Sequence, residues 1–138
     1  MGRRETREKA MKLLYQIQIQ KDDIEEQIER FIEEHNITDE SDKEYILDVV
    51  NGVIREQLSL DQLISRHLRG WTIGRIPKVD LAIIRLSSYE MKFRNDIPNN
   101  VSINEAVELA KKYCNDQSKA FINGVLGKIH VELQEKRT

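Results

Sequence analysis

Three arginines near the start of the chain have the residue type and spacing that suit the binding of phosphate groups. They lie in the stretch GRRETREKAMKLLYQIQIQ, as Arg3, Arg4 and Arg7. On a helical wheel they continue, toward the N-terminus, an apolar stripe made by Ala10, Met11, Leu13, Leu14 and Ile17. Such a stripe normally faces the core, yet an unpaired guanidinium group is almost never fully buried. The arginines therefore raise the question of what this end of the helix faces.

Two interpretations of the arginine cluster follow from the residues alone. A basic chain terminus is often solvated and disordered, but here the helical pattern begins inside the cluster, which favours an ordered helix end. Arginine offers planar, paired donors to phosphate and stacks on bases. Tyr15, at the edge of the stripe, would then be either an aromatic platform for a base or an ordinary core residue.

A second polar stretch, KKYCNDQSKAFINGVL, places a short loop between two predicted helices. Backbone N–H groups at the helix start near Ser118 would face outward and could receive a phosphate or a base edge. Three lysines flank the loop: Lys111, Lys112 and Lys119. An ordinary turn between helices is the alternative. Gly124 costs a helix about 1 kcal/mol relative to alanine, so we expect it to let a neighbouring helix approach closely.

The sequence carries no motif for catalysis, for a cofactor or for a metal. It lacks a GxGxxG or P-loop glycine pattern and an HExxH motif, and its three histidines lie far apart without ligand spacing. The single Cys114 can form no internal disulfide, and no apolar run reaches the roughly 18 residues of a membrane span. We therefore expect a cytoplasmic protein that is not an enzyme, holds no cofactor or metal and contacts no membrane.

Charge is segregated along the chain although the net charge is only −2. Residues 1–12 carry five basic groups against two acidic ones, whereas residues 22–48 carry twelve acidic groups against two basic ones. The part after residue 48 is mildly basic, with fourteen basic groups against ten acidic ones. A polyanion would be attracted to the first zone and repelled by the second.

Helical periodicity extends through the sequence. No stretch long enough to form a strand alternates apolar and polar residues with a period of two. We expect an all-α fold of about seven helices, near residues 3–21, 23–35, 40–57, 60–68, 77–93, 102–113 and 118–133. Trp71, between Gly70 and Gly74, marks a boundary inside one domain of residues 1–138. The boundary separates an N-terminal bundle, about 1–70, from a C-terminal bundle, about 71–138.

Several helix ends have recognisable signals. Asn36 is expected to end the second helix, and Ser59 to cap the fourth. Pro77 suits the first turn of the fifth helix, where its missing N–H costs nothing. Ser102 and Glu105 have the spacing of a capping box at the start of the sixth helix.

Three ordered blocks of the sequence resemble the NusB family of bacterial transcription antitermination factors. The blocks are RRETREKAMKLLYQIQ near the start, IPKVDLAIIRLSSYEM in the middle and VSINEAVELAKKYCNDQSKAFINGVLGKI near the end. The resemblance implies an all-helical protein of two bundles that binds the boxA element of ribosomal RNA leader transcripts. It also implies a protein partner, the small-subunit ribosomal protein NusE, and a complex with RNA polymerase, NusA and NusG.

The resemblance also assigns roles to single residues. It implies that Arg3, Arg4 and Arg7 face RNA rather than the core, and that Tyr15 contacts RNA as well. Glu5 departs from the pattern, because some relatives are basic there, and we therefore expect modest affinity for RNA alone. A second RNA-binding patch is implied at the loop and helix start that contain Asp116, Gln117, Ser118, Lys119 and Phe121.

For the protein partner, Asp80 matches an acidic position at the NusE interface of the family, with Arg85 and His67 as its neighbours. A structural role is the alternative for Asp80, because an acidic residue in the first turn also suits the helix dipole. Some family members self-associate through the RNA-binding face, and such a homodimer would compete with RNA.

Two other classes of function compete with RNA binding. One is a helical protein-binding adaptor without direct RNA contact, whose basic end is simply solvated. The other is enzymatic, because a similar helical domain is the N-terminal appendage of some ribosomal RNA cytosine methyltransferases. Such enzymes need a further nucleotide-binding domain, for which 138 residues leave no room.

Overall fold

Every regular element in the computed structural model, which describes residues 1–137, is helical. The helices are α1 (Arg3–Ile19), α2 (Ile24–Glu34), α3 (Glu40–Arg55), α4 (Gln57–Ser65), α5 (Lys78–Phe93), α6 (Asn99–Tyr113) and α7 (Asp116–Arg137), with a short 3-10 helix, η1, at Ile73–Arg75. The predicted all-α fold of about seven helices is confirmed.

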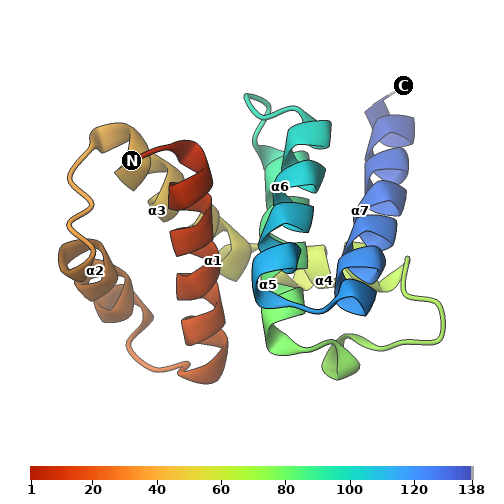
Figure 1. Ribbon diagram of the computed structural model, residues 1–138, viewed down its shortest axis with the longest axis horizontal. Helices are drawn as coiled ribbons and strands as arrows, with labels where there is room; N and C mark the ends of the chain where they lie inside the picture. Colours follow the sequence, from red (N-terminus) through yellow and green to blue (C-terminus); the bar gives the residue numbers. More distant parts are fainter. Residues whose placement is uncertain (138) are drawn as a thin grey trace.

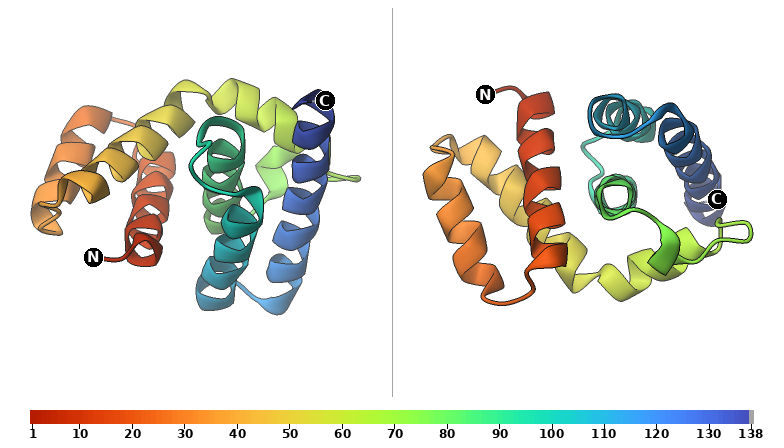
Figure 2. Two further views of the ribbon diagram at one scale, coloured as in Figure 1. Left: turned by 90° about the horizontal axis from the view of Figure 1, so that it is seen from above. Right: turned by 60° about the horizontal axis from the view of Figure 1, so that its bottom comes forward.

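The helices form two groups that meet at α5 (Figure 1). One group consists of α1, α2 and α3, and the other of α5, α6 and α7, while α4 runs from α3 beneath α5 and α7 (Figure 2). Because α5 packs against α1, α3, α4, α6 and α7, it is the central helix. Residues 80–91 are all buried, including the polar ones, so their polar groups need partners inside the protein.

α2 is attached to the rest of the molecule less broadly than the other helices. It packs mainly on α1, and its buried side chains are Gln27, Ile28 and Phe31. Asp23 and Asn36, at its two ends, have left-handed backbone conformations, with φ of 53° and 51°. Asp and Asn tolerate this conformation better than other non-glycine residues. The prediction that Asn36 ends the second helix is confirmed.

Two predicted helix caps are wrong, because their side chains contact other helices instead. The Ser59 hydroxyl lies within α4 and accepts a hydrogen bond from Lys92 Nζ at 2.9 Å. α6 begins at Asn99, so Ser102 and Glu105 lie inside this helix rather than at its start. Both of these side chains are directed toward α1 and α5, where they take part in the contacts described below.

The glycine that permits a close approach of two helices is Gly52, and the expectation for Gly124 is wrong. A Cβ atom at Gly124 would meet nothing within 4 Å. A Cβ atom at Gly52, on α3, would overlap the ring of Tyr89 on α5. The Tyr89 hydroxyl donates to Asp48 Oδ1 at 2.8 Å and so fixes the ring against α3.

Candidate nucleic-acid interface

Arg7 lies in a buried polar network instead of at the surface. Its side chain is 4% exposed, and its Nε donates to Glu90 Oε2 at 2.8 Å. The Glu90 carboxylate, itself fully buried, also accepts hydrogen bonds from the hydroxyl of Ser102, at 2.7 Å, and from that of Tyr45. The expectation that the Arg7 side chain lies outside the core is therefore wrong. It assumed an unpaired guanidinium group, whereas Arg7 is paired.

This Glu90 network, made of Arg7, Tyr45, Glu90 and Ser102, joins one residue from each of four helices. α1 and α3 come from the first group of helices, and α5 and α6 from the second. A buried carboxylate is tolerated when several donors compensate for its lost hydration. The network therefore ties the two groups together, and it makes Arg7 a positioning residue for the start of α1.

Arg3 and Arg4 lie nearer to the surface than Arg7. The Arg4 side chain is 71% exposed, and its Nε and Nη2 donate to the two carboxylate oxygens of Glu105 at 3.0 and 2.8 Å. These hydrogen bonds from Arg4 lower the pKa of Glu105. The guanidinium carbon of Arg3 lies 4.4 Å from the centre of the Tyr45 ring, which is a cation–π distance. Arg4 can reach a ligand, but a carboxylate already neutralises it.

Between α1 and α6 runs a surface groove of about 320 Å³, called here the α1–α6 groove. Its cations alternate with carboxylates, and each of the exposed cations forms an ion pair. Lys111 Nζ lies 3.1 Å from Glu108 Oε1, and Lys112 Nζ lies 2.6 Å from Glu8 Oε2. The groove is lined by Arg4, Arg7, Glu8, Glu105, Glu108, Leu109, Lys111 and Lys112.

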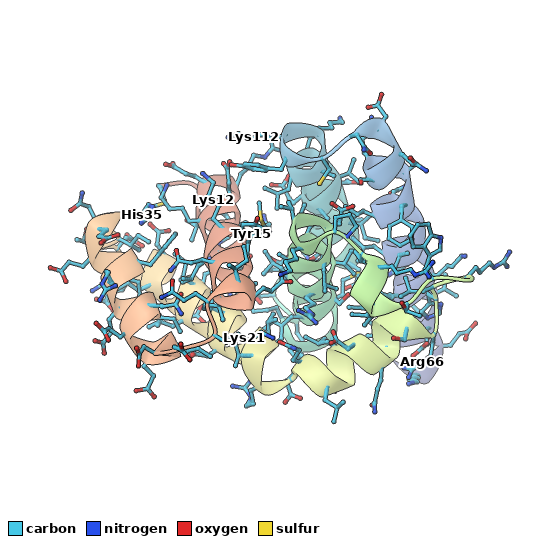
Figure 3. The ribbon with its side chains drawn as sticks, turned by 90° about the horizontal axis from the view of Figure 1, so that it is seen from below. Lys12, Tyr15, Lys21, His35, Arg66 and Lys112 are labelled. Atoms are coloured by element: carbon cyan, nitrogen blue, oxygen red, sulfur yellow. The ribbon has the colours of Figure 1, made fainter. Side chains whose placement is uncertain are left out.

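Further along α1 from this groove lie Lys12 and Tyr15. Figure 3 shows Lys12 and Tyr15 on α1, with Lys112 across from them at the end of α6. Lys12 Nζ lies 5.6 Å from the centre of the Tyr113 ring, which is 36% exposed as a residue. Tyr15 is partly buried and packs against the core. Sequence reasoning missed Tyr113, although it stands directly beside the lysine pair of α6.

The start of α7 presents the second predicted patch. The Asn115 side chain caps the helix, because its Oδ1 accepts from the backbone N–H of Ser118 at 2.8 Å. Asp116 and Gln117 are exposed, and Ser118 and Lys119 are half-buried. The predicted residues of this patch therefore lie on the first two turns of α7, which begins two residues earlier than predicted, and their contact with RNA stays a prediction.

An aromatic pocket of about 350 Å³ adjoins this turn and is called here the α7 pocket. Phe121, one of its lining residues, is half-buried, and the centre of its ring lies 6.3 Å from that of Trp71. Trp71 is 52% exposed, although it is the largest side chain of the loop before η1. The sequence signal for this residue is its position between two glycines, which predicts only the boundary between the two bundles. The pocket is lined by Trp71, Arg75, Ile76, Pro77, Asp80, Asn115, Gln117, Ser118 and Phe121.

Two of the residues predicted to bind a protein partner are buried. Asp80 is 4% exposed, and its Oδ1 accepts a hydrogen bond from Cys114 Sγ at 3.2 Å. Burial, together with this hydrogen bond, raises the pKa of the Cys114 thiol to about 12. Arg85 is 7% exposed, and its Nε and Nη2 donate to the carboxylate of Asp61 at 2.9 and 2.8 Å. Both side chains therefore have structural partners within the chain.

His67, the third residue predicted to bind a protein partner, lies elsewhere. Its Nε2 is 2.9 Å from Glu132 Oε1, on the face shared by α4 and α7. Arg66 also binds this carboxylate, at 2.7 Å, and the hydrogen bonds from Arg66 and His67 lower the pKa of Glu132 to about 2. The structure does not bring His67, Asp80 and Arg85 together, so a shared role at a partner interface stays a prediction.

The acidic zone, residues 22–48, covers α2 and the first half of α3, on the other side of α1 from α6 (Figure 1). It borders the start of α1, which together with the α1–α6 groove is called here the basic surface. The acidic zone therefore limits the area that a polyanion can cover. Within the described residues, no three His, Cys, Asp or Glu side chains are grouped in a way that could hold a metal ion. No helix in that part of the chain has the length and apolarity needed to cross a membrane.

Comparison with known proteins identifies relatives along almost the whole chain. The model of the NusB family matches residues 4–131. The transcription antitermination protein NusB of Acetivibrio thermocellus is 57% identical over 129 residues, which are 94% of this chain and 88% of that protein. That of Ruminiclostridium cellulolyticum is 50% identical, with the same coverage.

Solved structures agree with these sequence relatives. A structure of T. maritima NusB has a TM-score of 0.88 and 36% identity, and the match covers 96% of this chain and 92% of that one. A crystal structure of antitermination factors NusB and NusE in complex with dsRNA has a TM-score of 0.85 and 28% identity. That match covers 96% of this chain and 99% of the other.

Proposed function

The chain belongs to the NusB family, and on that premise we propose that it is a transcription antitermination factor. It binds the boxA element of ribosomal RNA leader transcripts together with the ribosomal protein NusE. The resulting complex joins RNA polymerase with NusA and NusG in the cytoplasm. The role is one of binding rather than catalysis.

One observation carries this proposal: the likeness to a NusB that was crystallised with NusE and dsRNA extends over 96% of the chain. The exposed groups of the candidate interface support it. Cations line the α1–α6 groove, and Tyr113 and Trp71 offer exposed aromatic rings. Single-stranded RNA is recognised through such a combination of positive charge and stacking surfaces.

We expect the variant Phe121→Leu to bind boxA RNA about tenfold more weakly, because a base that stacks on an aromatic side chain contributes about 1–3 kcal/mol. Leucine preserves the apolar contact with Trp71 while it removes the ring. The measurement is fluorescence anisotropy of labelled boxA RNA in the presence of NusE. Phe93→Leu is the matched control. Phe93 is 40% exposed, but it lies at the end of α5, whereas the α7 pocket adjoins the start of that helix.

Equal affinities of the wild type and the Phe121→Leu variant would make Phe121 a core residue without contact to RNA. A wild-type protein that binds NusE but no RNA would favour the competing function, a protein-binding adaptor. The structure offers one observation for that function, because the arginines at the start of α1 are already occupied by Glu105, Glu90 and Tyr45.

RNA and NusE are expected to bind cooperatively. Residues 1–12 carry a net charge of only +3, and α2 repels RNA that extends beyond the basic surface, so tight binding needs additional surface from the partner. Because binding linkage is reciprocal, boxA RNA must then strengthen NusE binding by the same factor, about tenfold. Titration calorimetry of NusE with and without saturating boxA measures this factor. A scrambled RNA of equal length is the control, and equal dissociation constants would show independent binding.

A further inference from the structure

Glu8, on the second turn of α1, holds two donor groups at the end of α6. Its Oε2 lies 2.6 Å from Lys112 Nζ and accepts a hydrogen bond from the Tyr113 hydroxyl. The ammonium groups of Lys12 and Lys112 each lie 5.6 Å from the centre of the Tyr113 ring. These four residues are called here the Glu8 cluster.

The geometry of the Glu8 cluster is that of an anion site filled from within the chain. The Glu8 side chain is 17% exposed, whereas the Lys112 side chain is 62% exposed. The donors that surround Glu8, an ammonium group and a phenol hydroxyl, are the same groups that contact phosphate oxygens in nucleic-acid complexes. The hydrogen bonds from Lys112 and Tyr113 lower the pKa of Glu8 and so favour its charged form.

The position of the cluster suits a polyanion that contacts both predicted patches. Glu8 and Lys112 line the α1–α6 groove together with Arg4. Tyr113 ends α6, two residues before Asn115, which lines the α7 pocket. The Glu8 cluster therefore adjoins both the groove and the pocket, where it can contact an RNA strand that runs from one to the other.

We propose that Lys112 and Tyr113 bind a phosphate of the RNA backbone, and that Glu8 occupies this phosphate site until RNA displaces it. This inference rests on the proposed function, because it assumes that the chain binds RNA. The negative charge of Glu8 then reduces the affinity for RNA, since each phosphate that uses these donors has to compete with a carboxylate already in contact. Tyr113 thereby becomes an RNA contact that the predicted RNA-binding residues did not include, and Lys112, expected only to flank the loop, gains a specific phosphate.

The experiment compares boxA binding by the full chain and by its Glu8→Gln variant, with NusE present. Glutamine keeps an oxygen acceptor for the Tyr113 hydroxyl but removes the charge that competes with phosphate. We expect the variant to bind boxA about three- to tenfold more tightly. The dependence of log K on log[salt] should steepen by about 0.7, the value for one further contact with a single-stranded phosphate.

Glu5→Gln is the control for charge alone: it removes one negative charge from the arginine cluster of α1 and should itself raise the affinity for RNA slightly, without involving the Glu8 cluster. Glu5 lies one turn earlier on α1, and its carboxylate binds Lys9 at 3.4 Å, outside the Glu8 cluster. Both variants change the net charge equally. The difference between their affinities for boxA therefore measures the effect of the Glu8 cluster alone. In the Glu8→Gln background, the further change Lys112→Gln should remove the gain in affinity. Circular dichroism spectra and thermal melts of all variants check that the fold is retained.

Two results would overturn the inference. If the Glu8→Gln and Glu5→Gln variants bind boxA equally, the cluster has no specific role. If Glu8→Gln weakens binding, then Glu8 orients Lys112 and Tyr113 for RNA and does not compete with it. In both cases the wild type still binds boxA, and the proposed function stands. If neither the wild type nor the Glu8→Gln variant distinguishes boxA from a scrambled RNA, the proposed function fails together with this inference.

Discussion

The variant Arg7→Leu is expected to lower the free energy of unfolding by about 3–5 kcal/mol, because it leaves the buried Glu90 carboxylate without its charged partner. Only the hydroxyl groups of Tyr45 and Ser102 would still donate to it within the network. A loss of this size is a large fraction of the 5–15 kcal/mol that stabilises a typical domain. The measurement is urea denaturation followed by circular dichroism.

Arg4→Leu is the control for this experiment, since Arg4 is one helical turn away from Arg7 and its side chain is 71% exposed. Exposed ion pairs contribute about 0–1 kcal/mol, so this variant should remain close to the wild type. In the double variant Arg7→Leu/Glu90→Leu no unpaired charge is buried, and it should recover part of the lost stability. A single Arg7→Leu variant as stable as the wild type would show that the pair contributes nothing.

The burial of Arg7 also changes how the arginine cluster should be tested for RNA binding. If Arg4 and Arg7 both faced RNA, as the resemblance implies, charge reversal at either position would leave the stability nearly unchanged, as at a solvent-facing helix end. Charge reversal at Arg7 would instead place two carboxylates together inside the protein, so a loss of RNA binding there would reflect unfolding. Arg3 and Arg4 are the positions at which RNA contact can be tested separately from stability.

Gly52→Ala is expected to destabilise the protein by about 1–3 kcal/mol, because the added Cβ overlaps the Tyr89 ring and forces α3 and α5 apart. This direction is opposite to the usual effect of the substitution, since alanine normally favours a helix by about 1 kcal/mol over glycine. Gly124→Ala provides the matched control. A Cβ atom there meets nothing, and that variant should be as stable as the wild type or more stable.

A second variant tests whether the Tyr89 ring causes the expected loss of stability in Gly52→Ala. Tyr89→Leu removes the ring atoms that the new Cβ would overlap, so Gly52→Ala should cost much less in that background. A double-mutant cycle from urea denaturation measures the coupling between the two positions. Purely additive free energies would show that the cost arises elsewhere, and that Gly52 does not serve the approach of α3 to α5.

The positions of the helices could be predicted because they depend on local patterns. The first helix was expected at 3–21 and is found at Arg3–Ile19, and the fifth was expected at 77–93 and is found at Lys78–Phe93. The last helix extends to Arg137 rather than to 133. Residues 134–136 of this extension are polar and exposed, so no apolar periodicity indicates that the helix continues there.

The candidate site was predicted less well, because its contacts join residues that are far apart in the sequence. Arg7 meets Glu90 across a separation of 83 residues, and a helical wheel contains no information about such a partner. For the same reason Ser102 matches a local capping pattern, although its hydroxyl donates a hydrogen bond to Glu90. Asp116 and Gln117 are exposed as expected, but they lie in the first turn of α7 rather than in the predicted loop.

The limited packing of α2 has a consequence for motion in the native state. A segment that contacts mainly one neighbour opens at a lower free energy than the whole domain, as a small cooperative unit of its own. Asp23 and Asn36 bound this unit, and neither the Glu90 network nor the Glu8 cluster includes a residue of α2. We therefore expect amide hydrogens of α2 to exchange faster than those of α5, while the basic surface keeps its shape when α2 opens.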